Sequence, residues 1–198
     1  MKSSVLLPWA FAAIVTPILM TAQTTPDSKP LAQQRKNAPA RDAYIVKYDV
    51  LDNGGGPLRI LYSDETVLEI QKERGRVKDG NATLTQDAFS EVQVANDRQH
   101  IGWLADYLIC AQSYPCAVAF GIFHAGSPPR YIEPDATIWE WAFLEQGKQI
   151  VLHVGLPHGD VDGHYLLYDS GDGRARGRFT PGQGLAPDWV RPLEERQR

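Results

Sequence analysis

The sequence predicts an all-β protein built from antiparallel sheets, and three observations support this fold class. From residue 43 onward, apolar side chains recur at every second position in short runs, which is typical of half-buried strands. Clusters of turn-forming residues separate the runs, as in the Asp-Asn-Gly-Gly-Gly stretch at 52–56. No window offers a capped, amphipathic helix of useful length.

The first 42 residues are expected to lie outside the folded domain. Residues 1–22 resemble a signal peptide, because Lys2 precedes an apolar run and Ala22 is a small residue at which a peptidase can cut. The alternative is a retained membrane anchor, although the run is short for a span of about 20 apolar residues. Residues 23–42 carry almost no large apolar side chains and are expected to form a flexible leader. We therefore expect a periplasmic or secreted protein with no membrane span after cleavage.

The overall composition is that of one folded domain. The chain of 198 residues is 43% hydrophobic and 22% charged, which argues against a wholly disordered protein. Its formal net charge is -4, without the clustered positive charge of a nucleic-acid binder. We assign residues 43–190 to an all-β repeat domain and residues 191–198 to a polar tail.

The first strands precede the repeat. Residues 43–50 alternate between apolar and polar side chains, and residues 58–62 and 66–70 are joined by the short polar turn at 63–65. This pattern predicts a hairpin. Residues 72–86 are polar and are expected to form a loop.

An internal repeat covers most of the remaining chain. Residues 91–104 match residues 140–153 at an offset of 49 residues, with a glutamate first and an isoleucine at the same place. In both copies an apolar strand runs into a polar turn and returns as an apolar strand. A second hairpin then follows in each copy, formed by 117–123 with 130–132 and by 165–168 with 174–179. A third copy is expected to begin at 187–190, and a period of this length indicates stacked or radial repeats.

Two turns carry a resemblance to a known family. Residues 96–101 (Asn-Asp-Arg-Gln-His-Ile) and 168–173 (Tyr-Asp-Ser-Gly-Asp-Gly) resemble the first and last turns of a TolB-type β-propeller blade, as in bacterial periplasmic proteins. The resemblance covers roughly residues 58–190 and implies about two four-stranded blades with flanking strands. Arg98 departs from the blade pattern, which usually has glycine there. Two blades cannot close a ring, so the resemblance implies an open fold in which sheets pack face to face or chains associate.

A second resemblance rests on two loops. The chain is similar to exported bacterial proteins that combine a loop containing cysteine and Ser-Tyr-Pro with a later His-Gly…His-Tyr segment. Here these are residues 110–116 and 158–165. This resemblance implies no particular activity.

The expected core consists of large apolar side chains in the repeated strands. We place Trp139 and Trp141 on one face of their strand and Ile138 on the other, as in a sheet that is covered on both sides. The expected core residues are Trp103, Phe120, Ile122, Trp139, Trp141, Phe143 and Ile150.

The loops at 110–116 and 153–164 join the second and third strands of their units, so we expect both on one rim. Loops on rigid sheets commonly carry function. Cys110 and Cys116 are predicted to form a disulfide in an oxidising compartment. The alternatives are two free thiols, or a nucleophilic cysteine beside His100 or His124.

The loop at 153–164 contains three histidines and two aspartates, residue types that bind zinc and other divalent metals. The candidate ligands are His158, Asp160, Asp162 and His164. Their spacing matches no established metal motif, and the alternative is that the glycines and aspartates supply turn geometry.

No catalytic motif is present in the sequence. It contains no Gly-x-Ser-x-Gly elbow, phosphate-binding glycine loop or dinucleotide fingerprint, so we predict no catalytic residue and no cofactor. The expected function is an exported binding or assembly module of the cell envelope. Its partner would be a protein or a second copy, bound through edge strands or the loop rim. The alternatives are a metal-dependent hydrolase using the loop from His158 to His164, and an inhibitor or purely structural envelope protein.

Overall fold

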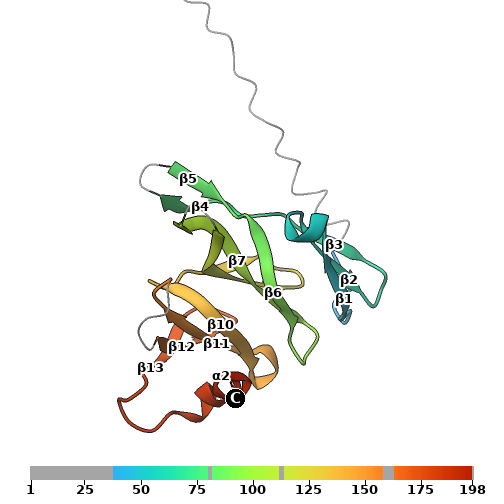
Figure 1. The fold of residues 1–198 in the computed structure, drawn as a ribbon. Coiled ribbons are helices and arrows are strands. Elements are labelled where there is room, and N and C mark those ends of the chain that lie inside the picture. The colour runs from blue at the N-terminus through green and yellow to red at the C-terminus, as the bar shows by residue number, and fades with distance from the viewer. Residues whose placement is uncertain (1–37, 80–81, 112–113, 158–162, 198) are drawn as a thin grey trace, which may run out of the picture.

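A computed structural model describes residues 38–197 apart from 80–81, 112–113 and 158–162 (Figure 1). In this part of the chain the strands form four antiparallel sheets, and no sheet closes into a ring. The predicted all-β, open fold is therefore confirmed.

The N-terminal sheet has the order β1-β2-β3 and confirms the strands expected there. Its strands are β1 (Ile45–Val50), β2 (Leu58–Tyr62) and β3 (Val67–Ile70), and the short helix η2 (Asp52–Gly54) lies between β1 and β2. The prediction of a loop at 72–86 is wrong. β4 (Arg74–Asp79) and β5 (Ala82–Thr85) pair there as a separate hairpin, whose mostly polar side chains obscured the strand pattern.

The two copies of the repeat fold into two four-stranded meanders. The middle sheet consists of β6 (Ala88–Val94), β7 (His100–Ala111), β8 (Tyr114–His124) and β9 (Arg130–Ile132). The C-terminal sheet consists of β10 (Thr137–Leu144), β11 (Gln149–Gly155), β12 (His164–Asp169) and β13 (Ala175–Phe179). In both, the strands pair in chain order. The predicted pair of four-stranded antiparallel units is thus confirmed.

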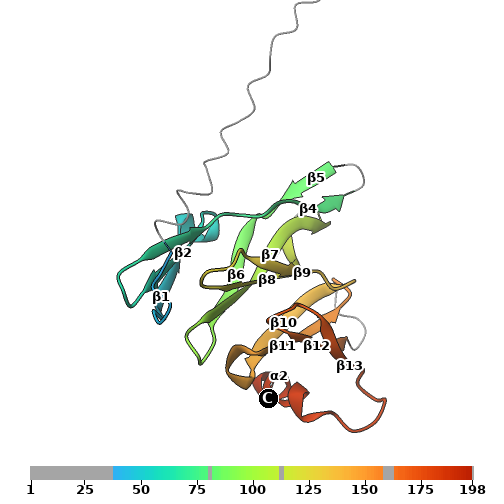
Figure 2. The same ribbon diagram turned by 180° about the vertical axis from the view of Figure 1, so that it is seen from behind.

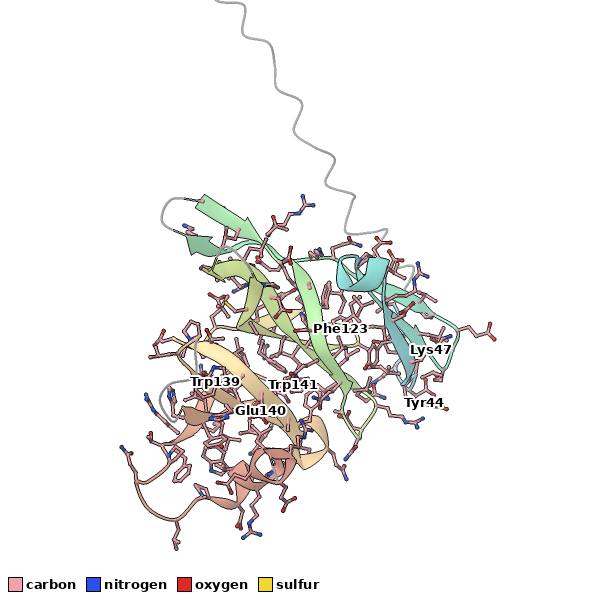
Figure 3. All side chains as sticks on the ribbon, in the orientation of Figure 1. Tyr44, Lys47, Phe123, Trp139, Glu140 and Trp141 are labelled. Carbon is pink, nitrogen blue, oxygen red and sulfur yellow. The ribbon has the colours of Figure 1, made fainter. Side chains whose placement is uncertain are left out.

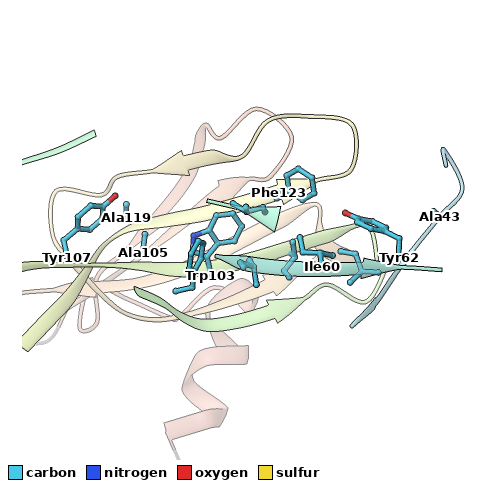
Figure 4. Close-up of a cluster of buried hydrophobic side chains, with 13 residues drawn as sticks. Ala43, Ile60, Tyr62, Trp103, Ala105, Tyr107, Ala119 and Phe123 are labelled. Atoms are coloured by element: carbon cyan, nitrogen blue, oxygen red, sulfur yellow. The ribbon is translucent and has the colours of Figure 1, made fainter. Parts of the chain in front are cut away.

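The three larger sheets pack face to face through apolar side chains. One cluster joins the N-terminal sheet to the middle sheet, with Ile60 and Tyr62 facing Trp103 and Phe123 (Figure 4). A second cluster joins the other face of the middle sheet to the C-terminal sheet and contains Phe120, Trp141 and Ile150. The middle sheet is consequently covered on both faces, and burial of these side chains is the main driving force for the stack.

A glycine makes room for the central tryptophan. A Cβ atom on Gly121 would lie 2.1 Å from Cε2 of Trp103, so only a residue without a side chain allows the indole to lie flat on β8. The indole also contacts Phe89 and Tyr131, with ring centroids 5.7 and 5.8 Å away. Trp103 and Gly121 are cross-strand partners of β7 and β8, so the glycine gives the indole room across the neighbouring strand.

The predicted placement of Trp139 and Trp141 on one face is wrong. The β10–β11 register shifts between Ile138 and Glu140, and such a bulge reverses the alternation of side chains. Ile138 and Trp141 both face the middle sheet, where Trp141 meets Phe120 at a centroid distance of 4.6 Å. Trp139 lies on the opposite face (Figure 3).

The C-terminal residues cover the far face of the C-terminal sheet instead of starting a third repeat or forming a polar tail. The segment contains η4 (Asp188–Val190), α2 (Arg191–Glu194) and η5 (Glu195–Gln197). Val190 and Leu193 are fully buried against Ala142, Val151 and Tyr165. Figure 2 shows α2 beside the C-terminal sheet, away from the other sheets. None of the helices in the described residues is long and apolar enough to cross a membrane.

Candidate functional site

The two predicted rim loops occupy equivalent places, between the second and third strands of their sheets. Most of the predicted metal site lies outside the described residues, because His158, Asp160 and Asp162 fall within 158–162. The described residues contain no group of three side chains able to hold a metal ion. The metal site therefore stays a prediction.

The part of this rim that is described is organised by aromatic packing. His153 stacks on Tyr165 with a centroid distance of 4.3 Å, and the edge of Trp139 approaches it at 4.9 Å. Nδ1 of His153 lies 3.8 Å from Oε1 of Glu140. Burial lowers the pKa of His164, and the nearby charges of Arg178 and His153 lower it further. Both histidines thus lie within the C-terminal sheet, His153 on β11 and His164 at the start of β12.

The two cysteines lie on neighbouring strands, and the open loop expected at 110–116 is instead the end of the long β7–β8 hairpin. Tyr107 pairs with Cys116, and Ala111 pairs with Tyr114. Cys116 is buried, whereas the side chain of Cys110 falls outside the described residues. The disulfide stays a prediction.

The predicted exposed edges form a better-defined site. β1 pairs only with β2, and β6 pairs only with β7, so both strands are edges within the described part of the chain. Between them lies an open groove with a volume of about 690 Å³, which we name the β1–β6 groove. It is lined by Ile45, Val46, Lys47, Tyr48, Val94, Ala95, Asn96 and Arg98.

Hydrogen bonds fix the two walls of the groove relative to each other. The backbone N–H of Ile45 donates to the carbonyl of Arg98 at 2.8 Å, and the hydroxyl of Tyr48 donates to the carbonyl of Val92 at 2.7 Å. Nε2 of Gln99 donates to the carbonyl of Ala43 at 3.2 Å. The groove therefore has a defined shape in the folded protein.

The groove combines exposed apolar side chains with positive charge. Tyr44, Val46 and Tyr48 are 42%, 52% and 40% exposed at or beside β1. The guanidinium of Arg98 lies 5.6 Å from the ring centroid of Tyr44, an arrangement that favours a fixed position for this cation. Lys47 is the second cation, and no carboxylate is among the lining residues. Figure 3 labels Lys47 on β1 and Tyr44 just before this strand.

Sequence reasoning expected an exposed edge but did not identify these residues. The available signal was the run from Tyr44 to Tyr48, in which tyrosine, valine and tyrosine occupy every second position. Its other wall, from Val94 to Arg98, is about 50 positions away, and only the folded chain shows that it lies alongside. No protein-family model matches this chain, and no curated protein matches its sequence.

Proposed function

We propose that this chain is an exported binding or assembly module of the cell envelope, which takes up an extended acidic segment of a partner protein in the β1–β6 groove. The observation that carries the proposal is the pair of edge strands that face each other across an open groove. The predicted signal peptide at residues 1–22 supports the export of the protein.

The edges favour an extended ligand. An edge strand presents backbone N–H and C=O groups that lack a neighbouring strand, and proteins use such edges to bind extended segments of other chains. Because the N–H of Ile45 already donates to Arg98, the part of β1 left for a ligand is 46–50, which corresponds to a length of about 17 Å. The exposed side chains of Val46 and Tyr48 offer apolar contacts to the ligand.

The charge of the groove favours an acidic ligand. Lys47 and Arg98 provide two positive charges without a carboxylate in the lining, although the whole chain has a net charge of -4. Complementary charge increases the association rate and selects among partners. An acidic segment would therefore be preferred over a neutral or basic one.

The experiment is a binding titration with a designed peptide. A peptide of about six residues that alternates valine and glutamate has the length of a typical strand, and the same peptide with lysine for glutamate is its matched control. We expect saturable binding of the glutamate peptide only. The variant Lys47→Glu, alone and with Arg98→Glu, should weaken that binding at least about tenfold. Arg174→Glu is the control, because this arginine is 80% exposed on the β12–β13 turn.

Three results would contradict the proposal. These are equal binding of the lysine peptide, an equal loss of affinity in Arg174→Glu, and unchanged affinity in folded Lys47→Glu. Light scattering of the free protein tests whether a second copy of this chain occupies the groove. A dimer that Lys47→Glu dissociates, together with no peptide binding, would assign the groove to a second copy of this chain.

A further inference from the structure

A second cavity lies between the middle and C-terminal sheets, at the strand ends opposite to the β7–β8 and β11–β12 loops. Its volume is about 280 Å³, and we name it the inter-sheet crevice. The crevice is lined by His100, Ile122, His124, Ser127, Pro128, Arg130, Ser170 and Gly171.

His100 is held in one orientation by Asp97. Nδ1 of His100 lies 2.6 Å from Oδ2 of Asp97, and Oδ1 of Asp97 accepts hydrogen bonds from the backbone N–H groups of Gln99 and His100 at 2.8 and 3.2 Å. Because Nδ1 is engaged with the carboxylate, Nε2 is the ring nitrogen left for a ligand. His124 contacts the same ring at a centroid distance of 4.7 Å. Two imidazoles thus stand together on one side of the crevice.

Arg130 provides a fixed positive charge on the other side. Its Nη1 donates to the carbonyl of Ser170 at 3.2 Å and to the carbonyl of Gly171. Among the described residues it has no carboxylate partner, since Asp169 and Asp172 of the neighbouring turn pair with Arg176 at 3.2 and 2.7 Å. Arg130 is therefore an exposed cation at the wall of the crevice, held by two carbonyls and without an acidic partner among the described residues.

We infer that the inter-sheet crevice binds a small ligand with an anionic group, a carboxylate or a phosphate, held between Arg130 and the two imidazoles. A guanidinium binds either group through paired N–H donors. Ile122 and Pro128 supply apolar contact for the organic part of the ligand, and the volume suits a small molecule rather than a protein segment. This site is separate from the β1–β6 groove and does not depend on the proposed function.

The test is an NMR titration of the histidine side chains with inorganic phosphate and, separately, with acetate, with chloride as the control for ionic strength. We expect the resonances of His100 and His124 to shift and saturate with phosphate, acetate or both, and the more effective anion identifies the ligand class. Arg130→Gln and His124→Gln should each weaken this binding at least about tenfold. Arg59→Gln is the matched control, because Arg59 pairs with Glu69 on the N-terminal sheet.

The inference is overturned if the shifts do not saturate, if chloride produces them equally, or if both crevice variants keep the affinity of the wild type. Arg130 also holds the turn at Ser170 and Gly171. The stability of Arg130→Gln is therefore first compared with that of the wild type by thermal unfolding. The side chain of His124 is exposed and holds no turn among the described residues, since only its backbone carbonyl bonds to the N–H of Ser127. His124→Gln therefore tests the site even if Arg130→Gln fails to fold.

Discussion

Arg98 and Gly147 occupy the same position in the two repeated hairpin turns, 49 residues apart, and both have a positive φ, of 55° and 94°. For a residue with a side chain this conformation costs about 1–2 kcal/mol, which glycine largely avoids. The first turn has arginine at this position and the second has glycine, although Glu145 and Gln146 before that glycine also have positive φ, of 46° and 57°. Because Arg98 lines the β1–β6 groove and its guanidinium lies over the neighbouring Tyr44, strain in the turn coincides with a residue of the proposed binding site.

The first prediction separates stability from binding at this position. Arg98→Gly should raise the free energy of unfolding by about 1 kcal/mol, because it relieves the left-handed conformation. The same change should weaken binding of the acidic peptide, since the groove loses one of its two cations. Urea unfolding followed by tryptophan fluorescence and the peptide titration measure the two effects.

Gly147→Ala is the matched control in the other turn. Its Cβ would lie 2.8 Å from Cβ of Ala95, in a backbone with φ of 94°, so a loss of about 1–3 kcal/mol is expected. If Arg98→Gly lowers the stability instead, the arginine side chain contributes more to the fold than its strained backbone removes, and the interpretation of this turn is wrong.

The repeat could be predicted because its signal is local. An apolar strand, a polar turn and a returning strand lie within 14 residues of each copy. The structure confirms that each copy belongs to a four-stranded meander. The side-chain directions around Trp139 and Trp141 could not be predicted, because a single bulge reverses the alternation. The hairpin of β4 and β5 was missed because its side chains are mostly polar on both faces.

The sites depend on contacts between distant parts of the chain. The β1–β6 groove brings residues 45–48 to residues 94–98, and the inter-sheet crevice brings His100 to Ser170. Both juxtapositions follow from how the sheets stack, and neither leaves a spacing pattern in the sequence. The histidines of the rim loop were conspicuous because they are adjacent in the chain, whereas Arg130 became a candidate only through its position.

The second prediction concerns the C-terminal helix as a cover for the stack. Leu193 is fully buried against the C-terminal sheet, so Leu193→Ala should lower the free energy of unfolding by about 2–4 kcal/mol. Leu185 is 98% exposed, and Leu185→Ala should change the free energy of unfolding by less than about 0.5 kcal/mol. Urea unfolding of both variants decides the question. Equal stability of the two variants would show that α2 is dispensable for the sheet that it covers.

The third prediction is a pH dependence that originates at Asp106. Burial raises the pKa of this carboxyl, the hydrogen bond from Ser90 opposes the rise, and the charge of Asp87 adds to it. The folded protein therefore keeps the proton to a higher pH than the unfolded chain, whose value is about 3.9. Stability from this group is present at low pH and is lost as the pH rises through the folded pKa.

Asp106→Asn removes the loss of stability with rising pH, because the amide stays neutral and its oxygen still accepts the hydrogen bond from Ser90. We expect the variant to be more stable than the wild type at pH 7, and the difference to shrink as the pH falls toward 4. Urea unfolding across this range measures it, with the exposed Asp135→Asn as the control that should show no such trend. A difference that stays constant with pH would mean that Asp106 does not carry the buried charge assigned to it.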